Sequence, residues 1–160
     1  MKQLCRIGII VVGIVVLFSS VATSAEEDVL QALERVKASI EDKVPYKKVA
    51  KLIDEAKIQV DTIRIGDTTN CFRVAIKRCY YWYHLGIKSW QAMIKNQELR
   101  DMHAKRAKSE YWDDQTKAIS LNMVKNYDKL IASAQETLPS KWEYGNAALD
   151  EARECLEKQR

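Results

Sequence analysis

Residues 26–160 contain only three glycines and two prolines, which are Gly66, Gly86, Gly145, Pro45 and Pro139. A β-rich or loop-rich fold needs many more of the residues that favour turns. Apolar residues recur instead at steps of three and four along most of the chain, the spacing that places them on one face of a helix. The sequence therefore predicts an all-α fold.

The glycines and prolines divide the first half of this region into helices. The first helix is expected over residues 26–42. The second begins at Pro45, because a first helical turn does not need the N–H that proline lacks, and it ends at Gly66. A polar residue among positions 67–69 is expected to cap the third helix.

A stretch with few apolar residues, 96–106, interrupts the pattern in the second half. We predict a turn near residues 96–101, because one unbroken helix would leave both apolar halves without partners. Pro139 is expected to end the fourth helix, and Ser140 with Glu143 forms a capping box for the fifth. The predicted architecture is an antiparallel bundle of about five helices with a long central helical hairpin.

The first 25 residues have the order of a secretory signal peptide. Lys2 and Arg6 precede an apolar run that ends at Phe18, and small residues then lead to Ala25. The run of twelve apolar residues is shorter than the roughly twenty that a membrane span needs. We therefore expect this segment to be a signal peptide that is cleaved near Ala25.

Cleavage would leave one domain over residues 26–160, in the periplasm or secreted from the cell. The alternative is an uncleaved segment that anchors the protein in the membrane through residues 7–22. Removal of residues 1–25 lowers the formal net charge from +4 to +2, because Lys2 and Arg6 are their only charged residues. A nucleic-acid-binding protein requires a stronger unopposed basic field, so we expect no nucleic-acid partner.

Three cysteines follow the signal segment. Cys71 and Cys79 are eight residues apart, about 12 Å along a helix, whereas a disulfide needs Cα atoms within about 7 Å. If the last helix runs parallel to the third, a turn near residue 97 aligns Cys155 with Cys71, and a turn near 101 aligns it with Cys79. We expect a disulfide from Cys155 to Cys79 or Cys71, which an oxidising compartment favours. Three buried free thiols are the alternative.

Residues 80–83 are four consecutive aromatic side chains, and they point to every side of a helix at steps of about 100°. They therefore do not all face one core. Tyr and Trp join a large apolar body to a polar tip, which suits the surfaces that bind partners. Tyr81, Trp82 and Trp90 are the candidate contact residues, and burial of the cluster in a central helix is the alternative.

Motifs for catalysis, metal binding or covalent cofactors are missing from the sequence. His84 and His103 lack the Glu-x-x-His spacing of di-iron bundles, and the chain has no C-x-x-C-H haem motif. The carboxylate pairs at 113–114 and 150–151 consist of neighbours that face different sides of a helix, which is poor geometry for acid–base chemistry. We expect no catalytic residue, no metal and no cofactor.

These observations favour an exported, non-enzymatic helical protein that acts as an interaction or scaffold module. Its expected partner is another protein or a component of the cell envelope, and a membrane becomes a partner only if the signal segment stays uncleaved. One alternative is a sensor or carrier bundle that binds a small ligand or haem in its interior. Another is a helical spacer tethered to the membrane.

Overall fold

The computed structural model describes residues 25–63 and 70–159, and this part of the chain contains helices and no strand. Residues 25–41 are helical, and three further helices follow: α2 (Tyr46–Thr62), α3 (Cys71–Lys108) and α4 (Asp114–Glu157). The all-α prediction is confirmed. The predicted signal segment before Ala25 lies outside the described residues, and so does Gly66. The second helix ends earlier than predicted, at Thr62, because Ile63 is already extended.

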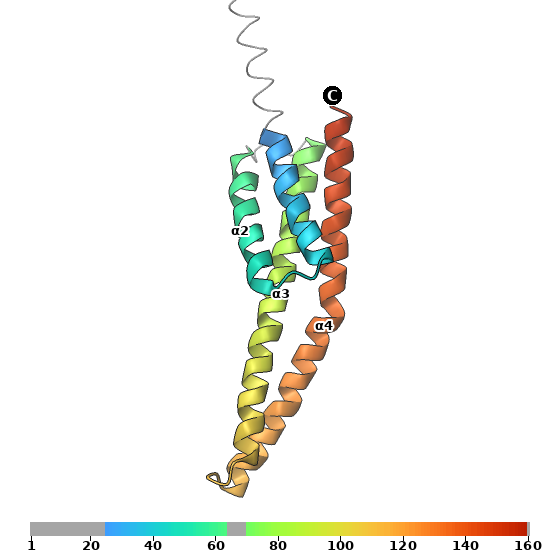
Figure 1. Ribbon diagram of the computed structural model, residues 1–160. Coiled ribbons are helices and arrows are strands. Elements are labelled where there is room, and N and C mark those ends of the chain that lie inside the picture. Colours follow the sequence, from blue (N-terminus) through green and yellow to red (C-terminus); the bar gives the residue numbers. More distant parts are fainter. Residues whose placement is uncertain (1–24, 64–69, 160) are drawn as a thin grey trace, which may run out of the picture.

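The helices form a bundle at one end of the molecule and a two-helix stem at the other (Figure 1). The helix over residues 25–41 and α2 lie beside the first half of α3 and the last half of α4. The remainder of α3 and α4 runs on as an antiparallel pair, here called the stem (residues 91–138), and turns at 109–113. The long hairpin expected from the sequence is therefore present.

The core lies in the bundle end, where each helix turns an apolar stripe inward. The stripe is clearest in the helix over residues 25–41, whose Val29, Leu33 and Val36 are fully buried at steps of four and three. The largest fully buried side chains of the other helices are Ile53, Phe72, Ile76, Tyr83 and Leu149. Within the described residues of the stem, only Ser120 and Ile131 are buried, so the stem is held by a narrow seam rather than by a core.

The turn of the hairpin lies at residues 109–113, and the predicted turn at 96–101 is wrong because those residues are inside α3. The prediction assumed that a long helix lacks a partner, but α4, with 44 residues against the 38 of α3, runs beside it. A two-helix seam needs apolar residues on one narrow side of each helix. A polar stretch such as 96–106 therefore stays helical, although none of its side chains is buried.

The predicted fourth and fifth helices are one helix, α4, which continues through Pro139. Pro139 is exposed, so water reaches the carbonyl group that its missing N–H leaves unbonded. Ser140 is not an N-cap; its hydroxyl donates to the carbonyl oxygen of Thr137 at 2.8 Å. The stretch that contains Pro139 is where α4 bends (Figure 1), and the described bundle has four helices rather than five.

Short polar residues start the two long helices. The side chain of Asn70 accepts a hydrogen bond from the backbone N–H of Arg73 at 3.1 Å, which places the cap of α3 just after the predicted positions 67–69. Asp113 accepts from the N–H of Thr116 at 2.7 Å and caps α4. This hydrogen bond lowers the pKa of the Asp113 carboxyl.

Lys43 ends the helix over residues 25–41 in the left-handed conformation, with φ of 54°. Its N–H donates to the carbonyl oxygen of Ile40 at 3.1 Å, and the N–H of Val44 donates to that of Ser39 at 3.0 Å. These two bonds are those of a Schellman motif, in which glycine usually takes the left-handed position. The chain then enters α2 through Pro45, as the sequence predicts.

Candidate contact site on the hairpin

Two glycines let α3 and α4 approach closely in the bundle. A Cβ atom built on Gly86 of α3 would be 2.1 Å from the ring of Trp142, and one on Gly145 of α4 would be 2.4 Å from the ring of Tyr83. Each helix thus places an aromatic ring on the glycine of the other. The hydroxyl of Tyr83 also donates to Oδ1 of Asn146 at 2.7 Å. The relative position of the two helices is fixed at this level by contacts in both directions.

Next to these two contacts between a ring and a glycine, three aromatic side chains form a surface cluster. We call it the aromatic cluster, and its members are Tyr81, Trp82 and Tyr144. The ring centroids of Trp82 and Tyr144 are 4.8 Å apart across the hairpin, and those of Tyr81 and Trp82 are 5.5 Å apart in an edge-to-face arrangement. Tyr81 is 55% exposed and Tyr144 is 56% exposed, whereas Trp82 is half-buried between them. The cluster presents two phenol groups to solvent on an apolar base.

The structure separates Trp90 from Tyr81 and Trp82. Trp90 packs edge-to-face on Tyr46 of α2, with ring centroids 5.7 Å apart, and is partly buried against the core. The other members of the four-residue aromatic run also divide: Tyr83 is fully buried, and Tyr80 stacks on His84. The run therefore reaches both the core and solvent, as its 100° steps require.

No protein-family model matches this sequence, and no curated protein or solved structure matches it either. A function for the chain therefore rests on its own side chains.

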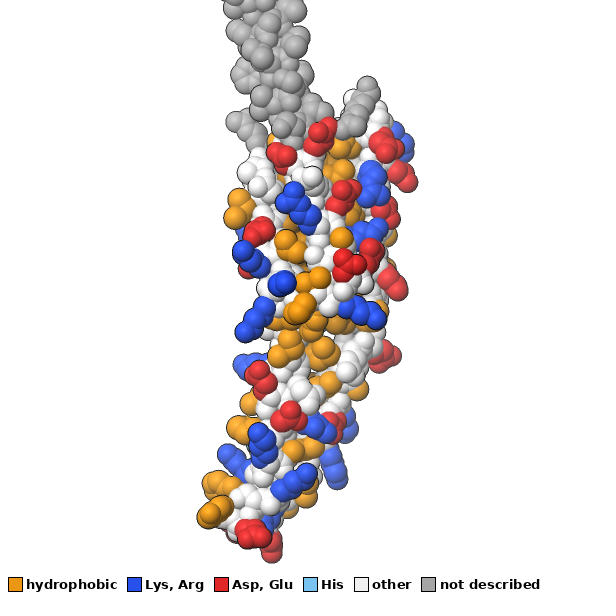
Figure 2. Space-filling model, viewed as in Figure 1, with side chains coloured by type: hydrophobic (Ala, Val, Ile, Leu, Met, Phe, Trp, Pro, Cys, Tyr) orange, Lys and Arg blue, Asp and Glu red, His pale blue; other side chains and the backbone are white. Residues whose placement is uncertain are grey.

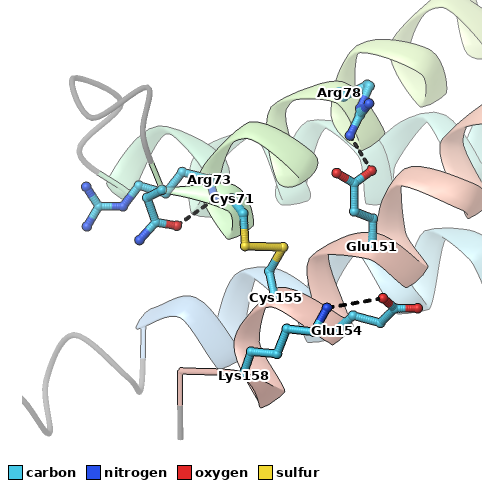
Figure 3. The surroundings of a disulfide bond; sticks show 8 residues. Cys71, Arg73, Arg78, Glu151, Glu154, Cys155 and Lys158 are labelled. Atoms are coloured by element: carbon cyan, nitrogen blue, oxygen red, sulfur yellow. Dashed lines mark hydrogen bonds and ion pairs between the residues drawn. A yellow bond between two sulfur atoms is a disulfide. The ribbon is translucent and has the colours of Figure 1, made fainter.

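A disulfide bond joins Cys71, the first residue of α3, to Cys155 near the end of α4 (Figure 3). Their Cα atoms are 5.9 Å apart. Both residues lie 42 positions from Asp113, so a single reversal of the chain at the hairpin turn brings them level. The alignment used to predict a partner for Cys155 was wrong, since α4 is antiparallel to α3 and not parallel.

Cys79 keeps a free thiol that is fully buried. Burial raises its pKa from 9.0 to about 12, because the interior disfavours the thiolate, and the neighbouring Tyr83 hydroxyl opposes part of this shift. The same burial raises the pKa of Tyr83. Both groups are therefore protonated and unreactive at neutral pH.

The described residues contain no group of three or more His, Cys, Asp or Glu side chains that could hold a metal ion. His84 stacks on Tyr80, and His103 stacks on Tyr127 at 5.8 Å within the stem. A groove of about 490 Å³ lies between the helix over residues 25–41 and α2, and its mostly polar lining includes Asp28, Arg35 and Glu55. Among the described residues, no helix has the length and apolar character of a membrane span.

On the face shown in Figure 2, basic and acidic side chains alternate over both bundle and stem, with small hydrophobic areas between them. Mixed charge of this kind is typical of a solvated surface. Hydrophobic side chains also gather at the tip of the hairpin, where Tyr111 is 97% exposed and the Arg106 guanidinium lies 5.2 Å from the centre of the Trp112 ring.

Tyr144 is the member of the aromatic cluster that the sequence analysis did not identify. It lies outside the four-residue aromatic run, and its position beside Trp82 depends on how α3 and α4 align. That alignment follows from the turn at 109–113. Tyr144 could be placed beside Trp82 only if the position of this turn had been predicted correctly. The exposed Tyr81 could be found without it, because its neighbours already fill the other sides of the helix.

Proposed function

We propose that this protein is a non-enzymatic helical interaction module whose contact site is the aromatic cluster. The observation that carries the proposal is the exposure of Tyr81 and Tyr144, each more than half in solvent, on two helices that are locked together directly beneath them. Tyrosine and tryptophan supply large contact areas at low cost in side-chain entropy and dominate the energetics of many interfaces.

The setting of the cluster supports binding without rearrangement. Trp82 is held against Tyr144, and the neighbouring rings of Tyr83 and Trp142 occupy fixed places on Gly145 and Gly86. A site that is rigid before binding loses little conformational freedom when a partner arrives. The cluster is therefore suited to a protein surface or another component of the cell envelope that offers an apolar pocket with hydrogen-bond acceptors for the phenol groups.

We also propose that the protein is exported and works in the periplasm or outside the cell. The disulfide between Cys71 and Cys155 supports this location, because such bonds persist in oxidising compartments. N-terminal sequencing of protein recovered from the periplasm or medium is expected to begin at Glu26. Recovery of full-length protein from the cytosol, with all its cysteines reduced, contradicts export.

The contact site can be tested by placing a photoreactive amino acid at Tyr144 in the full chain and irradiating living cells. A specific adduct is expected from position 144, and the substitution Tyr81→Ala in the same chain is expected to reduce it strongly. A photoreactive residue at Ile58, which is 64% exposed on α2, is the matched control. An adduct that forms equally from position 58, or that persists unchanged after Tyr81→Ala, rules out the aromatic cluster as the site.

A further inference from the structure

The aromatic cluster lies at one end of a longer uncovered face of the hairpin. Residues seven apart share one side of a helix in a two-helix pair, and two such rows border this side. The row on α3 is Val74, Tyr81, Lys88, Lys95 and Met102, and the row on α4 is Met123, Leu130, Thr137, Tyr144 and Glu151. All ten are exposed except Met123, which is half-buried. We call this surface the open face.

The helix over residues 25–41 lies on the opposite side of the hairpin, where Glu34 pairs with Arg153 at 2.8 Å and Lys37 with Asp150 at 3.7 Å. α2 packs on α3 at Trp90, which is not a member of either row. Because nine of the ten row members are exposed, neither of these helices covers the open face. It continues from the bundle into the stem, where Met102 is 44% exposed and Leu130 is 52% exposed. Apolar side chains are therefore available on both sides of the seam over about three heptads.

The charge of the open face is positive. Lys88 and Lys95 are exposed and pair with no carboxylate in the part of the chain that the structure describes. Lys141 of α4 reaches across the seam to Ser89, and the oxygens that it bonds among the described residues, those of Ser89 and Thr137, are neutral. The one acidic residue of the two rows, Glu151, is already paired with Arg78 (Figure 3).

We infer that the open face binds an amphipathic α-helix of a partner protein, with leucine-type side chains along its centre and carboxylates along its flanks. This inference rests on the proposed function and names the partner. The exposed apolar side chains of the two rows supply the apolar contacts, in the way that an amphipathic helix is bound in other complexes. The lysines supply the charge complementarity. From Tyr81 to Met102 the face is about 32 Å long, which requires a partner helix of at least three heptads.

Charge distinguishes this partner from two other occupants. A second copy of the chain would bring Lys88 and Lys95 of both copies together, and like charges in an interface oppose association. An anionic bilayer is wider than the hairpin and reaches its outer edges, where Glu98, Glu136 and Glu143 are exposed and repel anionic headgroups. A single helix is only about 10 Å wide and contacts the strip between those edges.

The test uses a synthetic 24-residue helix with leucine and isoleucine along one face and glutamate on both flanks, called the acidic probe, and the same peptide with lysine in place of glutamate, the basic probe. Fluorescence anisotropy with the full chain is expected to show binding of the acidic probe that weakens as salt is added. The double variant Lys88→Glu/Lys95→Glu is expected to bind the acidic probe at least tenfold more weakly and to prefer the basic probe.

The control is Lys105→Glu/Lys129→Glu, which makes the same charge change at two exposed lysines on the outer edges and is expected to stay within twofold of the unmodified protein. Circular dichroism checks that all variants fold. Equal binding of both probes, binding of neither, or an equal loss in the control overturns the inference. Cosedimentation with phosphatidylglycerol vesicles that depends on Lys88 and Lys95 overturns it in favour of a membrane. If adducts still form at Tyr144 when the acidic probe fails to bind, the contact function stands and only the helical partner is withdrawn.

Discussion

Trp142 of α4 lies on Gly86 of α3, so close that a Cβ atom at position 86 would be 2.1 Å from its ring. One turn away the roles are exchanged, and Tyr83 of α3 lies on Gly145 of α4. The two contacts set the spacing of the hairpin below the aromatic cluster. They also explain why two of the few glycines in this chain occur inside long helices, where glycine is unfavourable by about 0.5–1 kcal/mol relative to alanine.

The substitution Gly86→Ala is expected to destabilise the protein by about 1–3 kcal/mol, because the added methyl group overpacks against the Trp142 ring. Helix propensity alone predicts the opposite sign. Urea unfolding followed by circular dichroism measures the effect. In a Trp142→Leu background the ring is absent, and the same Gly86→Ala change should cost much less. A stabilised Gly86→Ala single variant would show that the ring moves away freely.

Loss of the disulfide is expected to lower the free energy of unfolding by about 4 kcal/mol, since it closes a loop with a sequence separation of 84 residues. The variant Cys71→Ala/Cys155→Ala and chemical reduction should agree. Thiol counting by mass spectrometry on the exported, unfolded chain should find one reactive thiol without reductant and three with it. Three thiols without reductant mean that the bond does not form. Cys79→Ala is the control, because it leaves the bond in place.

The free energy of unfolding is expected to fall as the pH rises above about 9. Burial raises the pKa of Cys79 to about 12 and also raises that of Tyr83, so the native state keeps these protons after the unfolded chain has lost them. The unfolded state then binds fewer protons, and each group lowers stability by up to about 1.4 kcal/mol per pH unit. Denaturation at pH 7–12 measures the slope. In Cys79→Ala the slope should be shallower, and an identical slope would exclude Cys79 as a source.

Lys43→Gly is expected to raise the free energy of unfolding by about 0.5–1 kcal/mol, because Lys43 has a φ of 54° and glycine adopts the left-handed region without steric cost. Thermal unfolding gives a direct comparison with Lys43→Ala. Alanine keeps the Cβ atom, so Lys43→Ala should not raise the free energy of unfolding. If alanine stabilises as much as glycine, the lysine side chain and not its backbone conformation carries the cost.

The boundaries of the first two helices could be predicted closely from the sequence, whereas the hairpin could not. Residues 25–41 and α2 differ little from the expected spans, since Pro45 and a regular apolar stripe mark them locally. The hairpin turn depends on the length of the facing helix, which is a tertiary property. Residues 96–101 look like a turn only when α4 is not known to run beside them.

The prediction that a helix ends at Pro139 was wrong for a related reason. A proline inside a helical pattern usually marks a boundary, but Trp142, one turn beyond it, still lies on Gly86 of α3. The aromatic run was easier to interpret, because four neighbouring rings on a helix must reach several environments whatever the fold. That reasoning gave Tyr81 and Trp82 as surface candidates, although the place of Trp90 depends on how α2 packs.

The covalent link and the exposed turn lie at opposite ends of the hairpin. A protease that cuts beside Tyr111, the most exposed aromatic residue described, therefore severs the chain without releasing either half. The two fragments should migrate as one species on a gel run without reductant and separate when dithiothreitol is added. The bundle should stay folded after such a cut, because its four helices keep their neighbours on both sides of the break.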